Sequence, residues 1–152
     1  MRHHRPSTCS LGAGAARNGG RWNAPGVPAL YMSATHSTAI AEYMQSLVRP
    51  GTLVAYQVRS AAILDVTDLD VRTRVGINET LLTLDWRHVR DIHRGTPPSW
   101  DFAGQAIAAG VDGMRVRSVQ NSGHNLVLWR WGEQGAEVEL IDPFVELAFD
   151  QA

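Results

Sequence analysis

Apolar residues occur along the chain in short runs and alternations that predict strands. Residues 27–33 form a mostly apolar run that is typical of a buried strand, and residues 52–59 alternate as a half-buried strand does. Residues 62–66 are expected to continue that sheet. Three further strands, joined by turns at 121–123 and 132–135, are predicted in residues 113–118, 125–131 and 136–141.

Residues 37–48 repeat their apolar positions with the period of an α-helix. At about 100° per residue, one arc of this helix holds only apolar side chains, those of Ala39, Ile40, Tyr43, Met44 and Leu47. Glu42 falls well outside the arc. We therefore expect the arc to face the core and Glu42 not to be a core residue.

Two more helices are expected in the second half of the chain. Residues 78–84 predict a short helix, followed by Trp86 in a polar loop rich in histidine and arginine. Ser99 is a suitable N-cap for a helix over residues 100–109, and Gly110 is a suitable stop. Because strands and helices are intermixed along the chain, the pattern predicts an α+β fold.

Composition and charge set bounds on this picture. With 152 residues, of which 44% are hydrophobic and 19% charged, residues 1–152 are expected to form a single domain with a real core. The net charge of −1 gives no electrostatic signature of nucleic-acid binding or of an anionic membrane surface. No apolar run approaches the roughly 20 residues that span a bilayer. The lone Cys9 excludes an internal disulfide, and we expect a cytoplasmic protein.

The most informative segment is residues 12–26, which contains five glycines and Pro25 and predicts a loop around Arg21 and Trp22. Glycine allows positive φ angles and a close approach of the backbone to a ligand. An arginine held in such a loop can bind a phosphate or a carboxylate through two N–H groups. The alternative is a flexible segment near the terminus, with Glu42 a solvated glutamate.

Two other kinds of site are not expected. Four histidines show neither the spacing of metal ligands nor nearby carboxylates or cysteines suited to zinc: His36, His88, His93 and His124. No glycine fingerprint of the GxGxxG type follows a strand, so a Rossmann-type NAD site is not expected.

The pattern GAGA…GGRWN…G.P.LY.S….A..E resembles the RES domain, which is named for an arginine, a glutamate and a serine. Arg21, Tyr31 ten positions later and Glu42 eleven further stand at the spacing of that family. Trp86-Arg87, the helix before Gly110, residues 116–118 and residues 125–129 look like its second half. Ser118 is the expected family serine, with Ser122 as the alternative, because the family often has a proline where Arg117 stands.

The resemblance implies the toxin of a bacterial toxin–antitoxin pair, encoded beside an Xre-type antitoxin. It also implies an ADP-ribosyltransferase-like core of small mixed or antiparallel sheets flanked by short helices. The implied activity consumes NAD⁺ as a substrate and needs no cofactor. Because such an enzyme must be restrained in its own cell, we expect an antitoxin segment to reach into the active cleft near Arg21.

The chemistry of that reaction fits the residues named above. Breaking the nicotinamide–ribose bond builds positive charge on the ribose, which a carboxylate such as Glu42 would stabilise. Arg21 would bind the pyrophosphate, and Tyr31 would offer its ring to the cationic nicotinamide. Ser118 would hydrogen-bond the substrate or the loop. The supporting loop residues are Gly20, Trp22 and Asn23.

The acceptor of the ADP-ribose stays open at this point, with water, phosphate and a protein target as the alternatives. A function of another class is also open. In this alternative, the chain is a non-catalytic module in which the same loop binds a phosphate ligand and Glu42 is only solvated.

Overall fold

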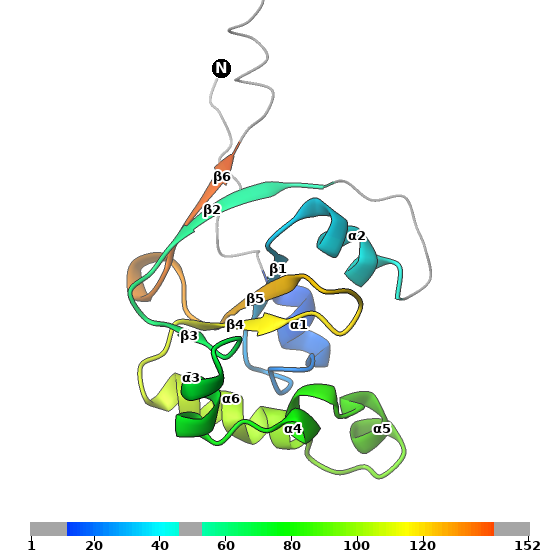
Figure 1. Cartoon of the computed structure of the whole chain (residues 1–152). Coiled ribbons are helices and arrows are strands. Elements are labelled where there is room, and N and C mark those ends of the chain that lie inside the picture. Colours follow the sequence, from blue (N-terminus) through cyan, green and yellow to red (C-terminus); the bar gives the residue numbers. More distant parts are fainter. Residues whose placement is uncertain (1–11, 46–52, 142–152) are drawn as a thin grey trace, which may run out of the picture.

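The computed structural model describes residues 12–45 and 53–141, and their strands form two sheets (Figure 1). In the larger sheet the order is β1–β5–β4–β3, with β5 antiparallel to β1 and β4, and with β3 parallel to β4. Its strands are β1 (Leu30–Ser33), β3 (Ile63–Asp65), β4 (Gly113–Arg117) and β5 (His124–Leu128). The second sheet pairs β2 (Ala55–Arg59) with β6 (Glu137–Ile141), antiparallel. The predicted α+β fold of small mixed and antiparallel sheets is confirmed.

Each predicted strand is present and shorter than predicted, and β5 begins one residue before its predicted start. The segment 62–66 supplies β3, but β3 belongs to the larger sheet and does not continue the sheet of β2. A polar turn separates the two strands: the Ser60 hydroxyl donates to Asp112 Oδ2 at 2.7 Å and accepts the Ala62 N–H at 2.9 Å. Residue 52, where the β2 segment was expected to start, lies outside the described residues, as does Cys9.

The glycine-rich segment is not all loop. Helix α1 (Ala13–Asn18) occupies its first half, between Gly12 and Gly19, which both have positive φ. Three of the six residues of α1 are alanines, and alanine is the best helix former. The loop that holds Arg21 is therefore shorter than predicted and begins at the end of a helix.

Helix α2 (His36–Tyr43) begins at Thr35, whose hydroxyl accepts the Thr38 N–H. The prediction that its apolar arc faces the core is wrong, since Ile40 is 46% exposed and Met44 59% exposed. The buried position is Thr38, because the side of α2 that meets the larger sheet carries hydrogen-bonding groups. Residues 46–48, the predicted end of this helix and the site of Leu47, lie outside the described residues.

Helices α3 (Leu69–Val75) and α5 (Trp86–Asp91) correct the sequence analysis. Helix α3 was not predicted, although Asp68 caps its start and Gly76, with φ of 75°, ends it. Trp86 does not lie in a loop: it begins α5, which Asp85 caps by accepting the His88 N–H. The short helix expected over residues 78–84 is α4 (Glu79–Thr83).

Helix α6 (Pro98–Ala108) packs on the larger sheet and forms the core with it. Ser99 is not its N-cap, because the helix begins two residues earlier with Pro97 as the cap, and the buried Ser99 hydroxyl instead donates to the Arg21 carbonyl. Gly110 follows the helix with φ of 86°, as predicted for a stop. The core cluster includes Trp22, Ala103, Ala106, Met114, Val116, Val127 and Trp129.

Figure 1 shows the larger sheet between two parts of the molecule: helices α3, α4, α5 and α6 on one side and the β2–β6 pair on the other. Helix α2 contacts β1. Among the described residues, no helix has the length and apolar character needed to cross a membrane.

Candidate functional site

The loop of residues 19–23 is built by close approach of its own groups. The Gly20 N–H donates to the Asn23 carbonyl at 2.9 Å, which closes a tight turn. A Cβ atom on Gly20 would lie 2.6 Å from the Tyr31 hydroxyl and 2.7 Å from Asn23 Oδ1. The glycine is therefore required here for the approach of two protein side chains.

Tyr31 and Asn23 fasten this loop to β1. The Tyr31 hydroxyl accepts the Trp22 N–H at 2.9 Å and donates to Asn23 Oδ1 at 2.7 Å. Asn23 is fully buried and its Nδ2 donates to the carbonyls of Ala15 and Val27. Burial raises the pKa of the Tyr31 hydroxyl, and the bond from the Trp22 N–H opposes this rise. The residue as a whole is 40% exposed.

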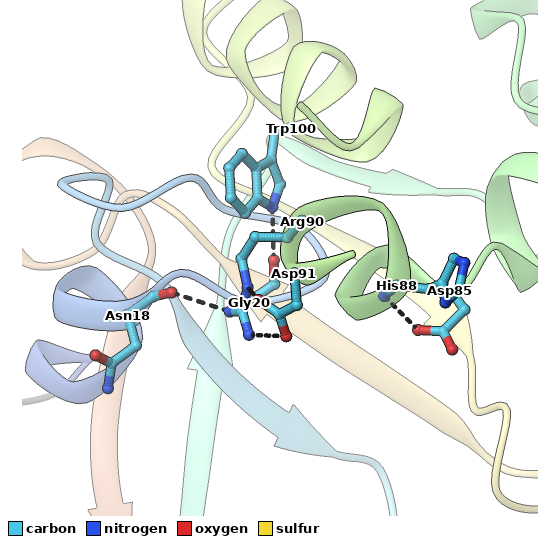
Figure 2. Close-up of polar contacts among 7 residues, drawn as sticks. All are labelled: Asn18, Gly20, Asp85, His88, Arg90, Asp91 and Trp100. Atoms are coloured by element: carbon cyan, nitrogen blue, oxygen red, sulfur yellow. Dashed lines mark hydrogen bonds and ion pairs between the residues drawn. The ribbon is translucent and has the colours of Figure 1, made fainter. Parts of the chain in front are cut away.

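Residues far away in the sequence hold the loop from behind. Figure 2 shows the Trp100 indole donating to the Gly20 carbonyl, a bond of 2.7 Å. The Trp129 indole donates to the Trp22 carbonyl at 2.8 Å, and Ser99 donates to the Arg21 carbonyl. These three supporting bonds were not predicted from the sequence. Each comes from a tryptophan or serine whose segment predicts a helix or strand but not the distant partner of its side chain.

The Arg21 side chain points toward the end of α4. Its Nη1 donates to the Leu84 carbonyl at 2.7 Å and to the Leu82 carbonyl at 3.4 Å, which are carbonyls of the kind that a helix end leaves unpaired. Burial and the neighbouring Arg87 guanidinium lower the pKa of Arg21. Within the part of the chain that the structure describes, these are the only acceptors of the guanidinium, so its other N–H groups can meet a ligand.

The Glu42 carboxylate lies at the junction of α2 with β4 and β5. Its Oε1 accepts the Ser118 hydroxyl at 2.6 Å and Asn125 Nδ2 at 2.6 Å. Its Oε2 accepts Gln45 Nε2 at 3.1 Å. Ser118 is buried, whereas the alternative Ser122 is exposed in the β4–β5 turn, so the structure places Ser118 against Glu42.

Asn125 was missed as a site residue. It heads the predicted strand of residues 125–131, and the resemblance includes residues 125–129 without giving Asn125 a role. Its link to Glu42 depends on strand register, since Asn125 lies opposite Ser33 on β1 and opposite Val116 on β4.

Arg21, Tyr31 and Glu42 line one open cavity of about 1760 Å³, to which Gly20 and Trp22 also contribute. Asn23 and Ser118 are buried behind the lining and contact Tyr31 and Glu42. Glu42 is the only carboxylate among the described lining residues, whereas the lining arginines are Arg21, Arg87, Arg90, Arg115 and Arg117. The cavity is therefore basic although the whole chain has a net charge of −1.

Helix α5 lines the cavity near Arg21. Arg90 reaches from α5 to the Asn18 carbonyl at the end of α1, at 3.4 Å, and pairs with Asp91 (Figure 2). The Arg87 and Arg90 guanidinium groups lie 5.0 and 4.8 Å from the centre of the Trp86 ring. Elsewhere among residues 12–45 and 53–141, no group of three or more His, Cys, Asp or Glu side chains could hold a metal ion.

Comparisons with known proteins place the chain in a family. The chain is similar to a chain in the crystal structure of the M. tuberculosis MbcT–MbcA toxin–antitoxin complex, with a TM-score of 0.57 and 20% sequence identity over 100% of this chain and 86% of that one. No curated protein matches the sequence. The RES domain model matches residues 2–150. Because this match spans nearly the whole length, the chain belongs to the RES domain family.

Proposed function

We propose that the chain is the toxin of a bacterial toxin–antitoxin pair and that it cleaves the nicotinamide–ribose bond of NAD⁺. The observation that carries the proposal is that Arg21 in a loop, Tyr31 on β1 and Glu42 on α2 line one cavity. Membership of the RES domain family and the fold shared with a toxin–antitoxin complex support the toxin role.

At the Glu42 end, the reaction breaks the bond between ribose C1′ and the nicotinamide nitrogen. The bonding electrons leave with nicotinamide, which becomes neutral, and positive charge develops on the ribose. A fixed carboxylate next to that charge stabilises the transition state more than the ground state. A nucleophile then bonds to C1′ and loses its proton. Water, phosphate and a protein side chain are the three acceptors consistent with the proposal.

At the Arg21 end, the cavity suits the anionic half of the dinucleotide. The unused N–H groups of Arg21 would bind the pyrophosphate. Arg87 and Arg90 on α5 add positive charge to the same cavity, and several arginines in a cleft raise the local concentration of an anionic substrate. Tyr31, which lines the cavity and is 40% exposed, would stack its ring on the nicotinamide.

The proposed partner is an Xre-type antitoxin whose segment enters the cavity and places a carboxylate on Arg21. The solved neighbour is a toxin–antitoxin complex, and an enzyme that drains NAD⁺ needs such a restraint. A structure of the complex in which the antitoxin contacts no residue near Arg21 would contradict this part of the proposal.

The test is release of nicotinamide from NAD⁺ by purified protein, compared with the Glu42→Gln variant. The variant keeps the size of the side chain and loses the charge, so we expect release to fall on the order of 100-fold. The matched control is Glu139→Gln on β6, an exposed glutamate outside the cavity lining, which should release nicotinamide at the wild-type rate. Release that is absent from the wild type, or unchanged in Glu42→Gln, contradicts the proposal.

The product then identifies the acceptor. Free ADP-ribose indicates water, ADP-ribose 1″-phosphate indicates phosphate, and labelled protein indicates transfer to a target. The alternative function is a non-catalytic module that binds a phosphate ligand, and the one observation that favours it is the basic lining of the cavity. It predicts that NAD⁺ binds and is recovered intact.

A further inference from the structure

We propose that the two oxygens of Glu42 have different tasks, and that Asn125 and Ser33 are the positioning residues that enforce the difference. Oε1 is the anchored oxygen and Oε2 is the oxygen presented to the ribose. This inference rests on the proposed function, because it assigns roles within the same reaction.

The anchoring of Oε1 follows from its two donors. Both Ser118 and Asn125 donate to it at 2.6 Å, and bonds to a charged acceptor are shorter than bonds between neutral groups. The Ser118 oxygen also accepts the Gln120 N–H at 3.0 Å, which leaves its hydrogen for Glu42. The two bonds use the lone pairs of Oε1 and fix the plane of the carboxylate.

Ser33 sets the orientation of the Asn125 amide. An ionised carboxylate only accepts hydrogen bonds, so the NH₂ group of Asn125 must face Glu42. The amide oxygen then points the other way and accepts the Ser33 hydroxyl at 2.7 Å. Because Ser33 and Asn125 are directly paired in the β1–β5 register, this chain of donors is built into the sheet.

The contact of Oε2 is of another kind. Gln45 follows α2, three residues after Glu42, and its side chain is exposed. Its own oxygen accepts a bond of 3.3 Å from the exposed Gln120 side chain. A long side chain at the surface gains little from holding one geometry. Gln45 therefore occupies the position of the substrate and leaves when the ribose binds.

The test compares kcat and KM for nicotinamide release among variants on the two sides of the carboxylate. Asn125→Ala should lower kcat about 10- to 100-fold, because a charged group loses one anchoring bond. Ser33→Ala should lower kcat several-fold, because it acts through Asn125. Gln45→Ala should lower KM, because the ribose no longer displaces a side chain, and it should not reduce kcat as Asn125→Ala does. An equal loss in Gln45→Ala and Asn125→Ala overturns the inference.

The pH profile of Asn125→Asp separates positioning from a general structural role. The new carboxyl can donate to Glu42 only while it is protonated, and two ionised carboxylates at this distance repel each other. The ratio of kcat for Asn125→Asp to that of the wild type should therefore fall about tenfold or more between pH 5 and pH 8. A ratio that does not change with pH overturns the inference.

Asn121→Asp is the matched control, since it adds the same charge to the β4–β5 turn. Its Oδ1 only accepts bonds, from the Gly123 N–H and the Thr38 hydroxyl, so the aspartate keeps both. Its kcat ratio should not depend on pH. Absence of nicotinamide release from the wild type would remove the proposed function and this inference together. If the wild type is active but variants on the Oε1 and Oε2 sides of Glu42 have the same effect, the inference alone is removed.

Discussion

The two ends of the cavity are held in place in different ways. At the Arg21 end, hydrogen bonds hold the loop backbone. The Trp22 N–H donates to the Tyr31 hydroxyl, and the indoles of Trp100 and Trp129 donate to loop carbonyls. At the Glu42 end, the bonds to the carboxylate from the described residues all come from side chains, and the two shortest come from partners 76 and 83 residues away in the sequence. The first end is a rigid backbone structure, and the second is a side-chain network on an exposed helix. We therefore expect substrate binding to depend on the fixed loop backbone, and the chemistry to depend on a few side-chain hydrogen bonds that single substitutions can remove.

Among the substitutions that test this difference between the two ends, Arg21→Lys is expected to have the largest effect on nicotinamide release. Lysine keeps the charge but lacks the fork that reaches both the Leu84 carbonyl and a phosphate. Losing a bond to a charged group predicts a fall of about 10- to 100-fold in kcat/KM for nicotinamide release. Arg17→Lys on α1, an exposed arginine outside the cavity lining, is the control and should match the wild type.

The rigid end is next tested by a pair of glycine substitutions measured by denaturant unfolding. Gly20→Ala should lower the free energy of unfolding by about 1–3 kcal/mol, because the added methyl overlaps the hydrogen-bonded Tyr31 and Asn23 side chains. Gly14→Ala, inside α1 with open space around the new methyl, should raise it by about 0.5–1 kcal/mol. Equal changes for the two variants would show that the loop is not closely packed.

The smallest of these effects is expected at the side-chain end, from Ser118→Ala. The variant removes one of the two bonds to Oε1 and should lower kcat about tenfold, with little change in unfolding free energy. Ser122→Ala in the same turn is the control, because that serine is exposed. If Ser122→Ala has the larger effect on kcat, the assignment of Ser118 as the family serine is wrong.

The same contrast explains what the sequence could predict. Arg21, Tyr31 and Glu42 were found because the resemblance is carried by local spacing, and the structure brings them to one cavity. Asn125 was missed because its partners are set by strand register, which local pattern does not reveal. Ser99 was assigned to a helix cap, but its hydroxyl supports the loop across a long sequence separation.

The fold was predicted well where elements have a strong period and less well elsewhere. Helices α1 and α5 have six residues each, too few to show the period of a helix clearly. The apolar arc of α2 was real in sequence, but periodicity does not say which side of a helix meets the sheet. That side holds Thr38 and the Glu42 network, so the polar face is the packed one. Net charge likewise hid the basic cavity, because five arginines and a single carboxylate stand among its described lining residues.

The most direct test of the account is a crystal structure of the Glu42→Gln variant with NAD⁺ bound. The account predicts one dinucleotide across both ends of the cavity, with its pyrophosphate on Arg21 and its nicotinamide-bearing ribose next to the side chain at position 42. A pyrophosphate that makes no contact with Arg21, or a nicotinamide ribose directed away from position 42, would contradict it.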